Sequence, residues 1–319
     1  MTYKHLFVMD PLESLNLQLD SSLRLMKELT VLGHQTFMAE PRHLSWHSAE
    51  KSARAKSTAI EFGNTASEVV GKGTSVMHLA DFDAIHMRKD PPYDMDYITT
   101  TWLLDSAQQH SKLYNHPNAL RTLNEKLAIF HFASETHPGI LSADSKVLLD
   151  FIKNDAKGDG IIKPLTLFGG RGVERINLND GSYNDETAIK HLDKITEQGH
   201  SARLMQPFDC AIFEGEVRVF TAFGEPIAWC LKRPAKGEFL ANTRVGAVLE
   251  SYTPKDIEVM RVKAIAESLI AEGVVFIGFD IIGSFVSEIN ITSPRLLTPP
   301  GDNTNYYIKM AQMIQDDIG

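Results

Sequence analysis

Three polar side chains interrupt the apolar stretch formed by residues 274–290. This stretch is rich in β-branched residues and broken by a turn signal at Gly283, which indicates two strands in a hairpin. Side chains alternate along a strand, so Glu288 and Asn290 share one face, and Asp280 on the other strand can lie opposite them. Two carboxylates and an amide oxygen are ligands that suit Mg²⁺. The pattern predicts a metal site, and a sheet with one solvated face is the alternative.

A lysine and a glycine cluster could bind phosphate. Lys163 is carried by a short predicted strand, residues 160–164, and Gly169 and Gly170 follow soon after. Glycine lets backbone amides approach an anion closely, and successive N–H groups can form a phosphate cradle. The spacing matches neither a Walker A motif nor a dinucleotide-binding glycine motif. A hairpin turn is therefore the alternative, and Lys163, as a point charge that reaches phosphates, favours the cradle.

Charged residues at three other places could also bind ligands. Arg218 lies in the middle of a predicted strand and needs a carboxylate or phosphate partner there. The polar loop 236–246, which contains Asn242, has the composition of a mobile binding loop or of an ordinary surface loop. Arg88 follows a short apolar run, and open α/β sheets bind ligands just past the carboxyl ends of their strands. A solvated loop is the alternative reading at Arg88.

Composition limits what the chain can do. Its 319 residues exceed one typical domain, and its 43% hydrophobic and 23% charged residues are typical of a globular protein. The net charge of -9 argues against a nucleic-acid partner bound through phosphate neutralisation. Cys210 and Cys230 are the two cysteines, and we find neither a secretory signal nor an apolar run of membrane-span length. We therefore expect a cytoplasmic protein without a disulfide framework or a membrane anchor.

Apolar periodicity and helix caps predict the elements that position these residues. The first part of the chain reads as strand, helix and strand, which suggests an α/β unit with a parallel sheet. Its predicted strands are residues 4–9, 35–39, 84–87 and 112–115, and its predicted helices are residues 20–32 and 96–110. Residues 53–76, mostly polar or small, give no clear pattern.

Strands and helices continue in the second part of the chain. The predicted helices are residues 124–132, 144–154, 256–272 and 306–318, and the predicted strands, besides the hairpin, are residues 160–164, 216–221 and 227–231. Gly273 ends the clearest helix. Residues 292–305, rich in Pro, Thr and Asn, are expected to form a loop.

Taken together, these stretches resemble bacterial glutathione synthetase, an ATP-grasp ligase family. The matching stretches run in the family's order over nearly the whole chain, and MRKDPP and EIN-TSP are specific to the family. They are VMDP at 8–11, DSSLRLMKEL at 20–29, MRKDPPYDMDYI at 87–98, NEKL at 124–127, IIKP at 161–164, GG at 169–170, EVRVF at 216–220, GEPIAWCLKR at 224–233, FIGFDIIG at 276–283 and EINITSP at 288–294.

The resemblance implies an α/β fold class, with an N-terminal parallel-sheet α/β domain followed by a two-part ATP-grasp fold. The implied domains are residues 1–120 on the substrate side, a central lid domain at 121–205 and a catalytic domain at 206–319. The implied reaction is the ATP-dependent joining of γ-glutamylcysteine to glycine through an acyl phosphate. ATP is the implied co-substrate, Mg²⁺ or alternatively Mn²⁺ the implied metal, and a homo-oligomer the implied assembly.

Individual roles follow from position within the resemblance. Asp280, Glu288 and Asn290 match the metal ligands, and Arg218 and Lys163 match residues that act on the transferring phosphoryl group. The positions expected to contact ATP are Lys126, Lys163, Gly169, Gly170 and Gln206, and those expected on the substrate side are Ser21, Arg88, Arg233 and Asn242. Phosphoryl transfer needs positioning and charge neutralisation, which these residue types supply. The acyl phosphate must also be shielded from water, and the loop 236–246 is the candidate lid.

Three segments depart from the family pattern. The family's phosphate loop reads Lys-Pro-Leu-Asp-Gly-x-Gly-Gly, and here Thr166, Leu167 and Phe168 replace its middle. The lid has lost or moved its usual arginine, and residues 295–301 replace the usual Thr-Gly-Ile-Arg-Glu that helps form the acceptor side. Two alternatives therefore stay open: a divergent ligase with a different donor or acceptor, and a non-catalytic nucleotide-binding relative.

Overall fold

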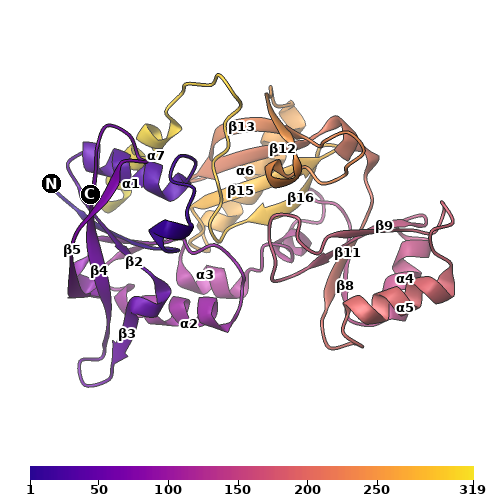
Figure 1. Ribbon diagram of the computed structural model, residues 1–319, viewed down its shortest axis with the longest axis horizontal. Coiled ribbons are helices and arrows are strands. Elements are labelled where there is room, and N and C mark those ends of the chain that lie inside the picture. The colour runs from indigo at the N-terminus through magenta and orange to yellow at the C-terminus, as the bar shows by residue number, and fades with distance from the viewer.

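The computed structural model describes residues 1–319 and organises the chain around three β-sheets (Figure 1). We call them the N-terminal sheet, with seven strands, the central sheet, with four, and the C-terminal sheet, with five. Each has its own helices, and the three sheets follow one another along the chain. None of the helices combines the length and the apolar character that crossing a bilayer requires.

Parallel strands form the heart of the N-terminal sheet, as the sequence predicts. β1 (Lys4–Val8) pairs in parallel with β2 (Gln35–Ala39) and β6 (Ala84–Met87), and β6 pairs in parallel with β7 (Lys112–Tyr114). Helix α1 (Ser21–Val31) begins where the Asp20 carboxylate accepts the Leu23 N–H at 2.9 Å, which is the expected cap. Helix α2 (Met95–Leu104) follows β6.

An antiparallel extension of this sheet was not predicted. β3 (Leu44–His47), β4 (Ser52–Phe62) and β5 (Val69–His78) continue the sheet beyond β2, so the N-terminal sheet is mixed. Residues 53–76 gave no pattern for two reasons. The buried face of β4 consists partly of small residues, such as Ala53, Ala55 and Ser57, and nearly all of β5 is exposed, so neither strand shows a clear apolar alternation.

The segment that leads into the central sheet corrects one prediction. The helix expected at residues 124–132 is wrong, because only a short 3₁₀ turn, Ala128–His131, forms there after helix α3 (Pro117–Thr122). The Asn124 side chain accepts the Lys126 backbone N–H at 3.0 Å. Such local side-chain bonds compete with a helical backbone, and this one turns the chain where a helix would begin.

The central sheet has the order β10-β9-β11-β8 and two helices on one face. Its elements are β8 (Ile140–Ser142), α4 (Ser145–Asn154), β9 (Asp159–Pro164), β10 (Glu174–Asn177), α5 (Asp185–Ile195) and β11 (Arg203–Pro207). α4 and β9 match the predicted elements, whereas β8, β10, β11 and α5 were not predicted. A separate core that includes Leu148, Ile152 and Leu192 holds the helices against the strands.

The C-terminal sheet carries the predicted hairpin. Its order is β14-β13-β12-β15-β16, and all neighbours are antiparallel. The strands are β12 (Glu216–Ala222), β13 (Glu225–Arg233), β14 (Val248–Ser251), β15 (Phe276–Ile282) and β16 (Phe285–Asn290), and helix α6 (Asp256–Ile270) packs on them. Register sets Asp280 opposite both Glu288 on β16 and Arg218 on β12.

The last helix returns to the first part of the chain. α7 (Tyr306–Ile318) packs on α1, and Tyr307 and Met310 share one core with Leu23 and Met26 (Figure 1). Residues 292–305 therefore connect the C-terminal sheet to the N-terminal unit as a loop. The division of the chain into domains at residues 120 and 205 stays a prediction.

Candidate functional site

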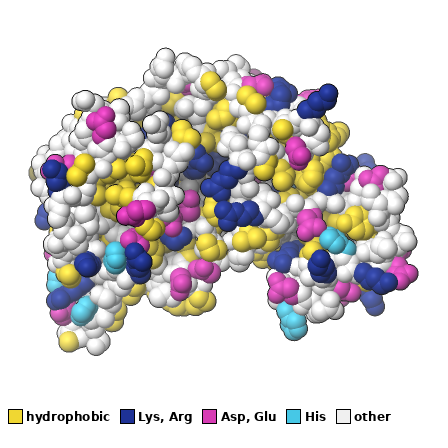
Figure 2. All heavy atoms as spheres, in the orientation of Figure 1, with side chains coloured by type: hydrophobic (Ala, Val, Ile, Leu, Met, Phe, Trp, Pro, Cys, Tyr) yellow, Lys and Arg dark blue, Asp and Glu magenta, His cyan; other side chains and the backbone are white.

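A cavity of about 270 Å³ lies between the central and C-terminal sheets and reaches the N-terminal unit. Its walls come from all three parts of the chain: Asp90 from the N-terminal unit, Lys163 from β9, and Arg218 and Asp280 from the C-terminal sheet. Figure 2 shows Lys and Arg side chains gathered in a hollow in the middle of this face. Segments far apart in sequence therefore meet around one charged space.

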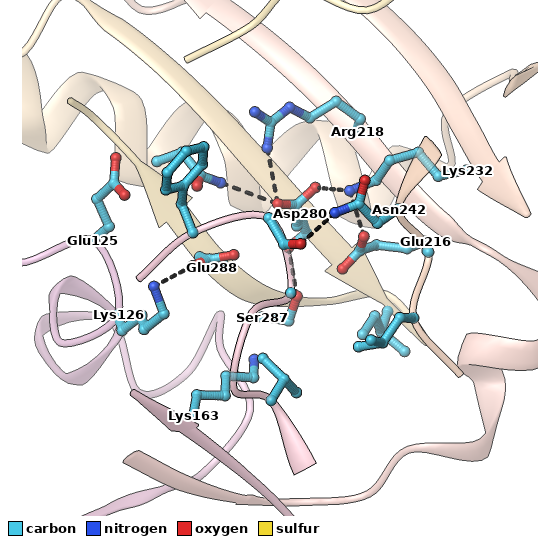
Figure 3. A pocket seen from close by; sticks show the side chains of 18 of the residues that line it. Glu125, Lys126, Lys163, Glu216, Arg218, Lys232, Asn242, Asp280, Ser287 and Glu288 are labelled. Carbon is cyan, nitrogen blue, oxygen red and sulfur yellow. Dashed lines mark hydrogen bonds and ion pairs between the residues drawn. The ribbon is translucent and has the colours of Figure 1, made fainter. Parts of the chain in front are cut away.

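Asp280 is the centre of a buried cluster of charges (Figure 3). One carboxylate oxygen accepts from the Lys232 ammonium at 2.6 Å, and the other accepts from the Arg218 guanidinium at 2.8 Å. The Asn290 amide nitrogen also donates to Asp280, at 3.0 Å. Lys232 forms a second ion pair with Glu216, so two carboxylates and two cations balance one another.

This balance keeps Asp280 and Lys232 ionised although both are buried. Asp280 is 5% exposed; burial alone would raise its pKa, but Arg218 and Lys232 lower the pKa to about 2. Burial would lower the pKa of Lys232, yet Asp280 and Glu216 together raise it. Burial and the nearby Asp280 charge raise the pKa of Glu216 to about 7. Charges so arranged are compensated only while every partner is present.

Two lysines face the cavity beside this cluster. The Lys126 ammonium is 3.2 Å from a Glu288 carboxylate oxygen and donates to the Leu167 carbonyl oxygen at 2.7 Å. Lys163 extends from β9 toward the same space, and no hydrogen bond or ion pair of its ammonium is present. Burial lowers the pKa of Lys163, as expected for a cation held among protein atoms. Lys163 is a cation that is free to bind an anion.

Two loops cover the cavity and touch each other. Gly169 and Gly170, in the phosphate loop (residues 165–172), have φ of +66° and +77°, a region that favours glycine. Asn242 of the lid loop (residues 236–246) donates to the Gly169 carbonyl oxygen. The Arg244 guanidinium lies 5.5 Å from the centre of the Phe168 ring, and Arg171 lies 4.9 Å from the same centre. The residues that depart from the family loop pattern therefore contact one another.

Two buried polar atoms of this charged space have no hydrogen-bond partner. Gln206 is 3% exposed, lines the cavity and has an amide nitrogen without a hydrogen-bond partner. The Arg218 Nε atom, which is also buried, lacks a partner too. Buried donors are nearly always hydrogen-bonded in folded proteins, so these two atoms indicate where a polar ligand would bind.

Comparison with known proteins matches this architecture from end to end. The family model for the prokaryotic glutathione synthetase N-terminal domain matches residues 3–121, and the model for the ATP-grasp domain of the same family matches residues 125–299. The chain belongs to the prokaryotic glutathione synthetase family. The expected fold class, an α/β N-terminal domain followed by an ATP-grasp fold, is thereby confirmed.

Relatives and solved structures agree with this family. Glutathione synthetase of Ralstonia nicotianae is 32% identical over 308 residues, which cover 95% of this chain and 92% of the relative. That of Pseudomonas syringae pv. tomato is 34% identical and covers 91% of this chain and 89% of the relative. D-cycloserine synthetase DcsG superposes with a TM-score of 0.70 at 14% identity, covering 99% of this chain and 100% of that one, which indicates a shared fold.

Most residues predicted from the sequence do meet at this cavity. Those in its wall are Lys126, Lys163, Gly169, Gly170, Gln206, Arg218, Asn242, Asp280, Glu288 and Asn290. Arg233 lies outside it, because alternation along β13 turns its side chain away from Lys232 and toward Glu250, which it contacts at 2.7 Å. Ser21 and Arg88 are buried and do not line the cavity, and they hold residues 294–296 instead. The substrate-binding roles of Ser21, Arg88 and Arg233 stay predictions.

Sequence reasoning missed Lys232 and Glu216 as residues of the site. Lys232 is 9% exposed and lies opposite Glu216 in the register of β12 and β13. A signal existed in the sequence, because Cys230 and Lys232 alternate on the face that pairs with Arg218 and Glu216. The alternation of side chains along β13 would have selected Lys232 in place of Arg233.

The donor atoms of the hairpin fit a hard divalent cation. The Asn290 side-chain carbonyl oxygen accepts no hydrogen bond, and the Lys126 contact uses only one Glu288 carboxylate oxygen. Asp280 lies next to both in the hairpin register and is held ionised. Oxygen ligands of this kind, close to a space lined by cations, suit Mg²⁺ shared with a polyphosphate.

Proposed function

We propose that this chain joins γ-glutamylcysteine to glycine, with the conversion of ATP to ADP and phosphate. The observation that carries this proposal is the Asp280 cluster, in which Arg218, Lys232 and Asn290 surround one buried carboxylate inside the cavity. Membership of the prokaryotic glutathione synthetase family supports the choice of substrates.

The position of each residue in the cavity suggests its role in the reaction. Lys126 and Lys163 would hold the nucleotide phosphates, with the phosphate loop above them. Gln206 would donate to the nucleotide base through its unpartnered amide nitrogen. Arg218 would bind the γ-phosphoryl group as a cysteinyl carboxylate oxygen of γ-glutamylcysteine attacks it and ADP leaves. The glycine amine then attacks the acyl carbon, and phosphate departs with that carboxylate oxygen.

Metal binding belongs to the same proposal. Asp280, Glu288 and Asn290 would hold Mg²⁺, and Mn²⁺ has the same ligand preferences. A bound Mg²⁺ neutralises phosphate charge when ATP is present. The contact of Lys126 with Glu288 orients that carboxylate toward the cavity, and Asn290 fixes the orientation of Asp280.

The two covering loops would protect the acyl phosphate from water. Asn242 and Arg244 of the lid loop contact the phosphate loop at Gly169 and Phe168. An acyl phosphate hydrolyses when water reaches it, so closure of this contact favours attack by the amine.

Substitution of Glu288 tests the proposal directly. Glu288→Gln removes one carboxylate charge from the hairpin while preserving its shape, so ADP release with both substrates should fall roughly 100-fold or more. Glu267→Gln, at an exposed position of α6, is the matched control and should leave turnover unchanged. Equal turnover of Glu288→Gln and the wild type would contradict the assignment of the site.

A different acceptor is the second candidate, and it rests on residues 295–301, which replace the family's Thr-Gly-Ile-Arg-Glu. Replacing glycine with each other amino acid in the same assay distinguishes the two. Turnover with another acceptor and none with glycine would select this second candidate.

We propose, as the family likeness implies, that the chain works as a homo-oligomer in the cytoplasm. Light scattering of the purified protein should give a mass that is a multiple of 35.6 kDa. A mass equal to one chain at assay concentration would exclude the oligomer.

A further inference from the structure

The end of the cavity that the N-terminal unit helps to form has a composition of its own. Asp90 and Pro91 of the N-terminal unit meet residues 293–295 and Leu297 there. The cations that surround the proposed phosphate positions come from the central and C-terminal sheets and, for Lys126, from the segment that leads into the central sheet. None of them comes from this end. A non-nucleotide substrate therefore has this end of the cavity available to it.

Arg295 is a cation without a protein partner at this end. Its side chain lines the cavity and is partly buried, and no hydrogen bond or ion pair of its guanidinium is present. By contrast, Arg218 and Lys232 contact Asp280, and Lys126 contacts Glu288. Arginine presents a planar fork of donors that matches a carboxylate.

The backbone on both sides of Arg295 is held in place. Arg88 donates to the Pro294 carbonyl oxygen at 3.0 Å, and the Leu296 N–H donates to the Ser21 hydroxyl oxygen at 3.1 Å. The Leu296 side chain is 4% exposed. These contacts fix the backbone from which Arg295 extends into the cavity, so its position does not depend on a flexible loop.

Asp90 brings the opposite charge to the same end. Its backbone N–H donates to an Asp10 carboxylate oxygen at 2.9 Å, which fixes the loop after β6. Burial raises the pKa of Asp90, and Asp10 raises it further. A ligand cation close by would therefore stabilise the ionised form of this carboxylate. Asp90 and Arg295 form no ion pair with each other, although both face the cavity.

We propose that Arg295 and Asp90 bind the free α-carboxylate and α-ammonium groups at the γ-glutamyl end of the donor peptide. This inference rests on the proposed function, because it assigns a part of that donor. The γ-glutamyl end keeps both charges throughout the reaction, since its peptide bond is made through the side-chain carboxyl group. Glycine also carries both charges, but its amine must lose a proton before it attacks, and an aspartate beside it would hold the proton in place.

Truncated donors test each half of the assignment. Glutaryl-cysteine lacks the α-ammonium group, and 4-aminobutyryl-cysteine lacks the α-carboxylate. With γ-glutamylcysteine, Arg295→Gln and Asp90→Asn should each lose roughly 10- to 100-fold in kcat/KM, as expected for a lost hydrogen bond to a charged group. Arg295→Gln should equal the wild type with 4-aminobutyryl-cysteine, and Asp90→Asn should equal it with glutaryl-cysteine.

An acceptor analogue tests whether Arg295 binds the acceptor instead of the donor. If the loss in Arg295→Gln disappears when glycinamide replaces glycine and persists with 4-aminobutyryl-cysteine, Arg295 binds the acceptor carboxylate, and the assignment to the donor is overturned. A loss of equal size with every donor and acceptor means that Arg295 only shapes the cavity, which also overturns it. Arg42→Gln, an exposed arginine paired with Glu40, is the matched control.

Calorimetric titration with γ-glutamylcysteine separates this inference from the proposed function. Wild-type protein should bind the dipeptide, and Arg295→Gln should bind it roughly 10-fold or more weakly at an unchanged melting temperature. If the wild type binds but does not release ADP, the proposed reaction fails and the binding assignment stands. Equal affinity of both proteins, or no binding to the wild type, overturns the assignment.

Discussion

Two polar clusters in the interior of this molecule differ in their charge. In the N-terminal sheet, His5 and His86 contact each other at 3.2 Å and are fully buried, and His34 lies beside them. In the C-terminal sheet, Asp280 and Lys232 are buried, and the partly buried Arg218 and Glu216 are paired with them. The first cluster stays neutral, because burial and then His34 lower the pKa of His5 to about 3. In the second, Arg218 and Lys232 hold Asp280 ionised, and only Glu216 has a pKa near neutrality.

The difference follows from what each cluster faces. The histidines pack against Phe7 and Tyr114, so no charged ligand can reach them. The charged cluster lines the cavity, where its side chains could bind a polyphosphate and a metal ion in place of one another. Paired charges retained in the wall of a cavity therefore distinguish a binding site from polar groups that are merely packed.

Removing the central carboxylate should have the largest effect. Asp280→Asn takes away a charge that Arg218 and Lys232 share, so ADP release should fall roughly 1,000-fold or more. The protein should remain folded, because Glu216 keeps a carboxylate next to Lys232. Initial rates and thermal melting measure the two effects, with Asp150→Asn, at an exposed position of α4, as control. Turnover within a few-fold of wild type would make this cluster as structural as the histidines.

Removing a buried cation should mainly affect stability. Lys232→Met removes the one cation that contacts Glu216 and leaves Asp280 in contact with Arg218 alone. Breaking such a buried pair costs about 3–5 kcal/mol of unfolding free energy. Urea unfolding measures the loss, and adding Glu216→Gln should recover part of it. Lys153→Met, which breaks an exposed pair with Asp185, should cost about 1 kcal/mol or less. Equal losses in the two variants would remove the distinction between buried and surface pairs.

The neutral cluster should respond to acid. Burial lowers the pKa of His5 and His86, and the groups that face them are His34, Arg88 and, through His34, Asp83 and the N-terminal amine. The unfolded state therefore binds more protons below the usual histidine pKa of about 6.5, so stability is complete above that pH and is lost as the pH falls toward 3.

Between pH 6.5 and 5, each of these histidines should remove about 1–2 kcal/mol of unfolding free energy. Urea unfolding at a series of pH values measures the slope, which His5→Phe should reduce. His200→Gln, at an exposed position, should leave the slope unchanged. A His5→Phe protein with the wild-type slope would show that the histidines do not stay neutral in the folded state.

The loops above the charged cluster should give the smallest effect. Arg244→Gln removes one cation from the face of Phe168, an interaction worth about 1 kcal/mol, so KM for ATP should rise about fivefold. In a double-substitution cycle, Phe168→Leu should cause most of the same rise and should abolish the effect of Arg244→Gln. Additive effects of the two substitutions would mean that the loops act independently.

Sequence reasoning succeeded where side chains alternate between a buried and a polar face. The hairpin of β15 and β16 and the cap of α1 by Asp20 follow from local patterns, and both are confirmed. It failed at β5, which has no buried face, and at residues 124–132, where Asn124 bonds the backbone. In the site, Arg218 and Asp280 were found because a buried charge in an apolar strand is conspicuous. Lys232 was missed because the alternation along β13 was not followed, and its partners come from two other strands that the sheet register brings together.

The most direct test of the charged cluster's role follows a carboxylate oxygen. The cysteinyl carboxyl group of γ-glutamylcysteine would be labelled with ¹⁸O, and the phosphate released during turnover with ATP and glycine would be analysed by mass spectrometry. If that carboxylate attacks the phosphoryl group, one labelled oxygen should appear in each phosphate. Phosphate without label, in a reaction that still forms the tripeptide, would contradict the proposed transfer.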